Sequence, residues 1–127
     1  MQYLLDTVAV IRHFTGNKNI GKAAKEILSR TNDVQFYIST ISLMEILYLA
    51  EKSRIQIDLK DTLKRIRSSS LYFIVDLTPQ IIESAIDLDF YELHDRMILA
   101  TAKWLEIPIL SSDKKFEEIK SITCIWD

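Results

Sequence analysis

The chain has 127 residues, of which 48% are hydrophobic and 27% charged, and this composition is typical of one globular domain that spans residues 1–127 and buries its own core. The formal net charge of −2 excludes a general polycation, so any binding of nucleic acid requires a local basic face. Cys124 is the only cysteine, which excludes an internal disulfide and favours a small core residue in a reducing, cytoplasmic compartment.

The order of apolar and amphipathic segments predicts alternating strands and helices. Short apolar runs predict buried strands at residues 3–5, 36–38, 72–75, 107–110 and 122–126. Helical spacing and helix-start signals predict helices at residues 7–14, 20–30, 41–52, 59–67, 78–88, 93–105 and 114–119. This alternation indicates an α/β fold, a three-layer α/β/α domain with a central, mostly parallel sheet, whose functional crevice lies beyond the carboxyl ends of the strands. The sequence shows no bilayer-spanning stretch and no signal peptide, so we expect no membrane partner.

Four carboxylates are predicted to meet at that edge of the sheet. Asp6 directly follows the first predicted strand, and Asp113 comes shortly after the fourth. Glu45 and Asp95 lie in the opening turns of two of the predicted helices. Carboxylates that converge in this way cannot all remain ionised without compensation, and a hard divalent cation commonly supplies it. We therefore expect a site for Mg²⁺ or Mn²⁺.

The residue types of the chain limit the chemistry of such a site. A bound metal lowers the pKa of a water molecule and offsets charge on a phosphate under attack. The sequence holds no serine beside a histidine with a partner carboxylate, no zinc-type Cys/His spacing and no Gly-rich phosphate loop. With these alternatives absent, the sequence favours cleavage of a phosphodiester by a metal ion held by carboxylates.

Each candidate also has a structural explanation. Glu45 stands three residues after Ser42, which is the pattern of a capping box. Asp113 is placed to cap the short helix that follows it, and Asp95 is favoured by the first-turn N–H groups of its own helix. Asp6 is the hardest to explain structurally, because aspartate is depleted in strands.

Basic residues near these positions are candidates for substrate contacts. Arg96 could contact a substrate phosphate or pair with a neighbouring carboxylate. Lys60, Lys64 and Arg67 form a stripe at helical spacing that could touch an RNA backbone, although a solvated helix face explains it more simply.

Four stretches, in order and at family spacing, resemble the PIN-domain family and in particular its small VapC-type toxins: Tyr3-Leu-Leu-Asp-Thr7, Ile38-Ser-Thr-Ile-Ser-Leu-Met-Glu-Ile-Leu47, Asp95-Arg-Met-Ile-Leu-Ala-Thr-Ala102 and Ile109-Leu-Ser-Ser-Asp113. The resemblance covers nearly the whole chain. It implies a Mg²⁺- or Mn²⁺-dependent endoribonuclease in which the four acidic residues hold the metal and activate water. It also implies a homodimer that is silenced by a cognate antitoxin protein.

The sequence departs from the family pattern at Val8, where the family often has a small polar residue, so Thr7 or Ser111 would have to supply the hydrogen bond expected from this position. One alternative is a non-catalytic module that binds RNA or protein and keeps the acidic pocket for structural reasons. Another is a phosphoacceptor receiver domain, which is disfavoured because Asp6 has no second acidic residue beside it.

Overall fold

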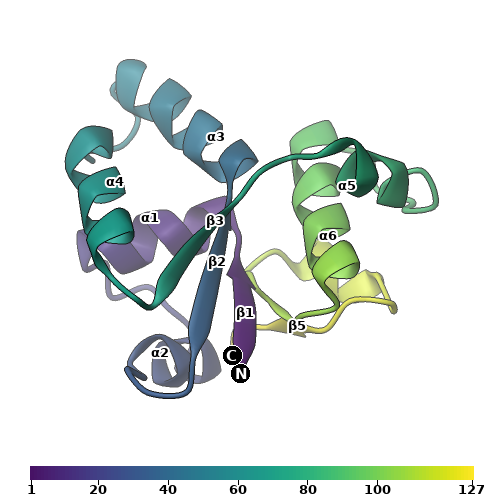
Figure 1. Cartoon of the computed structure of the whole chain (residues 1–127), viewed down its shortest axis with the longest axis horizontal. Helices are drawn as coiled ribbons and strands as arrows, with labels where there is room; N and C mark the ends of the chain where they lie inside the picture. The colour runs from purple at the N-terminus through teal and green to yellow at the C-terminus, as the bar shows by residue number, and fades with distance from the viewer.

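The computed structural model describes all residues 1–127 and contains a single sheet of five parallel strands in the order β3-β2-β1-β4-β5 (Figure 1). The strands are β1 (Gln2–Leu5), β2 (Gln35–Ser39), β3 (Tyr72–Val75), β4 (Ile109–Leu110) and β5 (Cys124–Ile125). Every strand pair is parallel. The predicted α/β fold is therefore confirmed, and the sheet is entirely parallel.

Helices cover both faces of the sheet (Figure 1). They are α1 (Thr7–Thr15), α2 (Lys22–Leu28), α3 (Thr40–Glu51), α4 (Leu59–Ser68), α5 (Pro79–Ser84), α6 (Leu93–Leu105) and the 3₁₀ turn η1 (Lys114–Glu118). Tyr3 and Leu5 of β1 pack in a core with side chains of α1, α2 and α4, whereas Leu4 packs in a second core with α5, α6 and η1. Because successive side chains of a strand point to opposite faces, β1 joins two separate cores, and the three-layer prediction is confirmed. None of the helices has the combination of length and apolar character needed to cross a membrane.

The register of the central strands brings three polar residues, Asp6, Ser39 and Ser111, to one edge of the sheet. Leu5 pairs with Ile38 on β2 and with Leu110 on β4, so the residues that follow these strands emerge side by side. The chain first builds the sheet outward from β1 to β3 and then crosses to β4 on the other side. The boundary between β1 and β4 is therefore the switch point at which parallel sheets form their functional crevice.

Several predicted elements are longer than the observed ones. The helix predicted to reach residue 88 ends at Ser84, because the N–H of Ile86 bonds the Glu83 carbonyl in a tighter turn, and the Arg96 guanidinium takes the carbonyl oxygens of Ala85 and Ile86 that follow. The strand predicted from residue 107 begins at 109, because the N–H of Ile107 closes the end of α6 by donating to the Ala102 carbonyl.

Two further elements are also shorter than predicted. The last strand shrinks from 122–126 to Cys124–Ile125, and α2 starts at Lys22 instead of residue 20. Cys124 is partly buried in β5, where burial is the main cause that raises the pKa of its thiol to about 11. A thiol with so high a pKa is poorly reactive.

Gly21 is predicted to be essential for stability. A Cβ at this position would lie 2.2 Å from the backbone oxygen of Trp126, which also accepts the N–H of Ala24. We expect Gly21→Ala to lower the free energy of unfolding by about 2–3 kcal/mol, as measured by urea denaturation. Gly16→Ala is the matched control, because that Cβ meets nothing within 4 Å and only the positive φ costs about 1 kcal/mol. An equal loss in the two variants would contradict the steric explanation.

Candidate functional site

Asp6 is a buried carboxylate at the switch point of the sheet. It follows β1 directly and caps α1, since its Oδ1 accepts the N–H of Ala9 at 2.8 Å. Burial raises the pKa of Asp6 to about 6, against the hydrogen bonds from Ser111 and Ala9, which lower it. The charges of Asp113 and Glu45 raise the pKa further.

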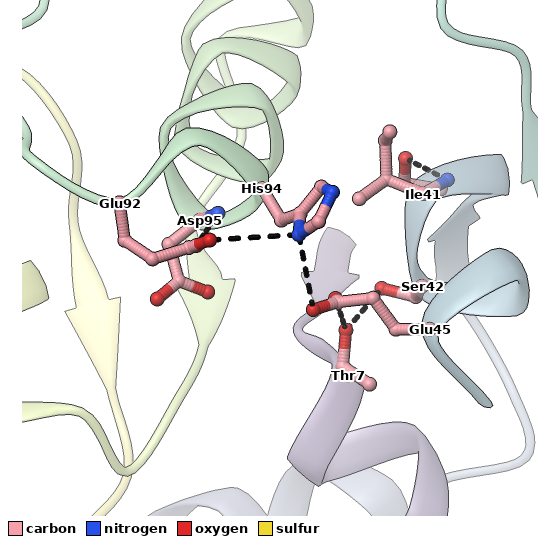
Figure 2. A network of polar contacts seen from close by, with 8 residues as sticks. Thr7, Ile41, Ser42, Glu45, Glu92, His94 and Asp95 are labelled. Carbon is pink, nitrogen blue, oxygen red and sulfur yellow. Dashed lines mark hydrogen bonds and ion pairs between the residues drawn. The ribbon is translucent and has the colours of Figure 1, made fainter. Parts of the chain in front are cut away.

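Glu45 is held by a hydroxyl group from another helix (Figure 2). The Thr7 hydroxyl lies 2.5 Å from Glu45 Oε1 and 3.0 Å from the Ser42 hydroxyl. The predicted capping box is wrong, because Ser39 is the N-cap of α3, with its Oγ accepting the N–H of Ile41 at 3.0 Å. Glu45 is consequently in the second turn of α3 and not in the opening turn, and its side chain is free to face the crevice.

Asp95 lies in the first turn of α6, as predicted, and four other carboxylates act on it. Its N–H donates to Glu92 Oε2 at 2.7 Å, so Glu92 caps the helix. The pKa of Asp95 is raised to about 7, first by burial and then by the charges of Glu92, Glu45, Asp113 and Asp6. The charges of all three other predicted site residues therefore act on Asp95.

Asp113 completes the set and is tied to Asp6 through Ser111. Its Oδ1 accepts the N–H of Lys115 at 2.9 Å, which confirms the predicted cap of the short helix. Its own N–H donates to Ser111 Oγ at 3.1 Å, and the Ser111 hydroxyl also bonds Asp6. Thr7 thus bonds Glu45 and Ser111 bonds Asp6. These are the hydrogen bonds that the two residues were expected to supply in place of Val8. Val8 is 39% exposed and makes no side-chain hydrogen bond.

The donor set suits a hard cation, although no three His, Cys, Asp or Glu side chains form a ready-made metal shell. All four candidates offer carboxylate oxygens, which Mg²⁺ and Mn²⁺ prefer. Mg²⁺ keeps several waters and needs only one or two direct carboxylates, so a closed shell of three is not required. Asp95 and Asp113 also line a hollow of about 480 Å³ with Lys115 at its side. Mutual repulsion among the carboxylates is what a bound cation would relieve.

Two neighbours of Asp95 behave differently from the sequence-based expectation. Arg96 donates to the Ala85 carbonyl at 2.9 and 2.7 Å, so it fastens α5 to α6 and neither faces the crevice nor pairs with a carboxylate. His94, which the sequence did not single out as a site residue, lies with Nδ1 3.5 Å from Glu92 Oε1 and 4.0 Å from Glu45 Oε2 (Figure 2). The sequence signal for Glu92 was its position three residues before Asp95, which is the spacing of a side-chain cap.

These features define an all-parallel α/β/α domain with an acidic crevice at its switch point. The PIN domain model matches residues 3–122, so the chain belongs to the PIN-domain family. No curated protein sequence matches the chain.

Solved structures of similar fold cover nearly the whole chain. VapBC2 from Rickettsia felis, bound to a promoter DNA fragment, shares 19% identity over 100% of both chains, with a TM-score of 0.76. A toxin–antitoxin complex from Klebsiella pneumoniae shares 26% identity over 95% of both chains, with a TM-score of 0.68. VapC20 from Mycobacterium tuberculosis, a toxin that cleaves the sarcin–ricin loop, shares 19% identity over 91% of this chain and 93% of its own, with a TM-score of 0.65. The fold predicted from the four motifs is therefore confirmed.

Proposed function

We propose that the protein is a metal-dependent endoribonuclease and the toxin of a VapBC-like type II toxin–antitoxin system. The observation that carries the proposal is the approach of Asp6, Glu45, Asp95 and Asp113 from four separate segments. Asp6 and Asp113 follow the paired strands β1 and β4. Thr7, next to Asp6, contacts Glu45, and Asp95 lines one hollow with Asp113. Membership of the PIN-domain family supports a nuclease, and a neighbour of the same fold is a toxin that cleaves RNA.

The four carboxylates would hold Mg²⁺ or Mn²⁺, which when bound offsets charge on the phosphate and makes a water molecule more acidic. Asp6 is fixed by the Ala9 N–H and the Ser111 hydroxyl, so its oxygens keep one orientation. Thr7 fixes Glu45 in the same way, and we assign Glu45 to accept the proton from the attacking water. The groups that we propose to bind the metal, orient the carboxylates and accept the proton therefore come from chain segments far apart in sequence.

Protein partners are part of the proposal. Met44, Leu47 and Tyr48 expose about half of their surface on α3, and Met44, Tyr48 and His94 border a hollow of about 370 Å³ next to Glu45. Exposed apolar groups that gather on one face are typical of protein interaction sites. We propose a cognate antitoxin as one partner, since the similar structures include toxin–antitoxin complexes. We propose a second copy of the chain as the other, because this exposed apolar face of α3 offers it a contact surface.

Metal dependence tests the proposed function directly. We expect a chelator to abolish cleavage of a labelled RNA, and added Mg²⁺ or Mn²⁺ to restore it. In a parallel thermal scan, metal at ten times its Kd should stabilise the protein by about 1.4 kcal/mol, because it binds only the folded state. Tight RNA binding without metal-dependent turnover on any RNA would contradict the nuclease function and favour the non-catalytic binding module.

A further inference from the structure

Charge is segregated along the chain although the net charge is only −2. Residues 12–67 contain eleven Lys and Arg against six Asp and Glu, whereas residues 68–127 contain five against eleven. The first segment comprises the end of α1 together with α2, α3 and α4, and the second comprises α5, α6 and η1, which lie on opposite sides in Figure 1. The molecule therefore has a positive half and a negative half, and the positive half attracts polyanions.

The positive half contains a cavity of about 260 Å³ between the end of α1 and α2. Arg12, Lys18 and Lys25 line it, and no carboxylate does. The Arg12 guanidinium is held in place, because it donates to the Asn19 carbonyl at 2.9 Å and lies 5.9 Å over the Trp126 ring. Lys18 and Lys25 are exposed and take part in none of the ion pairs of the protein, so their charges are available to a ligand.

We propose that this cavity binds a backbone phosphate of the RNA strand, at a distance from the bond that is cut. The inference rests on the proposed nuclease function. Helix α1 connects the two places, since Asp6 caps its first turn and Gly16 caps its last. At about 1.5 Å per residue this is a separation of roughly 13 Å, which a strand cleaved in the crevice spans within a few nucleotides. The volume of about 260 Å³ equals about nine waters at roughly 30 Å³ each, enough for a phosphate with its hydration.

RNA fits this surface better than an acidic protein does. A nucleic acid carries one charge per nucleotide along its whole length, which matches a positive half that extends beyond the cavity. A guanidinium fixed in one orientation also suits the oxygens of a phosphate, to which it donates two parallel hydrogen bonds.

The test is the double variant Lys18→Gln/Lys25→Gln, assayed with a fluorescent 12-nucleotide single-stranded RNA. In chelator, where nothing is cut, we expect Kd to rise about tenfold and the slope of log affinity against log salt to flatten by about 0.7 per phosphate lost. In Mg²⁺, KM should rise by the same factor while kcat stays unchanged, because these residues bind the substrate equally in the ground state and the transition state.

Lys22→Gln/Lys120→Gln is the matched control, since it removes the same charge from exposed lysines that do not line the cavity. Equal losses in both double variants, or no loss in either, would overturn the site. Lysine-dependent binding of inorganic phosphate as tight as that of RNA would assign a free-phosphate site instead. Tighter lysine-dependent binding of an oligoglutamate peptide would assign an acidic-peptide site. If Lys18 and Lys25 are needed to bind an RNA that the protein never cleaves, the phosphate site stands and only the proposed nuclease function is overturned.

Discussion

Asp95→Asn is expected to reduce kcat/KM for RNA cleavage by about 10³-fold or more while the fold stays intact. Asparagine has the shape of aspartate but no charge, so the variant removes an anionic oxygen from the crevice without opening a cavity. The backbone N–H of residue 95 keeps its bond to Glu92, so the start of α6 is preserved. Asp6→Asn should behave in the same way, because asparagine caps helices about as well as aspartate and can still accept the N–H of Ala9.

The control for these variants is Asp87→Asn, which neutralises an exposed carboxylate on the same half of the protein. We expect its cleavage rate to match that of the wild type. Near-ultraviolet circular dichroism should show native packing in all three variants. Full-rate cleavage by both Asp6→Asn and Asp95→Asn in excess chelator would show that the activity comes from elsewhere.

The sequence predicted the fold well because the determining signals are local. Tyr3, Leu4 and Leu5 form an uninterrupted apolar run, which is what a strand covered on both faces requires, and they divide between the two cores as a strand must. Asp6 could be placed for the same reason, because a residue that directly follows a buried strand has only the carboxyl edge of the sheet to occupy.

The sequence was less informative where distant contacts decide the structure. Ser42 and Glu45 have the spacing of a capping box, but α3 begins at Thr40, so Ser42 already lies inside the helix and Ser39 is the cap. Adjacent residues on a helix point about 100° apart, so Arg96 cannot share the direction of Asp95 and meets α5 instead. His94 reaches Glu45 only because α3 and α6 face each other across the crevice, and nothing local encodes that approach.

The stability of the metal-free protein is expected to fall as pH rises through the neutral range. The pKa of Asp95 is raised from 3.8 to about 7 and that of Asp6 to about 6, so the folded state holds protons that the unfolded state has lost. By linkage, the contribution of these two groups to stability is greatest near pH 4 and declines until both are ionised, above about pH 7. Solvent screens part of the effect at the half-buried Asp95, and we expect a loss of about 2 kcal/mol between pH 5 and pH 8.

Urea denaturation of the wild type and of Asp95→Asn, at both pH values, isolates this effect. The variant should resemble the wild type at pH 5 and exceed it in stability at pH 8, because only the wild type then carries the extra buried charge. His13, whose pKa is lowered mainly by burial, changes stability in the opposite direction, but equally in both proteins, so the comparison cancels it. Saturating Mg²⁺ should recover the stability of the wild type at pH 8 and leave Asp95→Asn nearly unchanged. A wild type that is as stable at pH 8 as its variant, with or without metal, would mean that the four carboxylates do not repel one another, and the reason to expect a cation in the crevice would be gone.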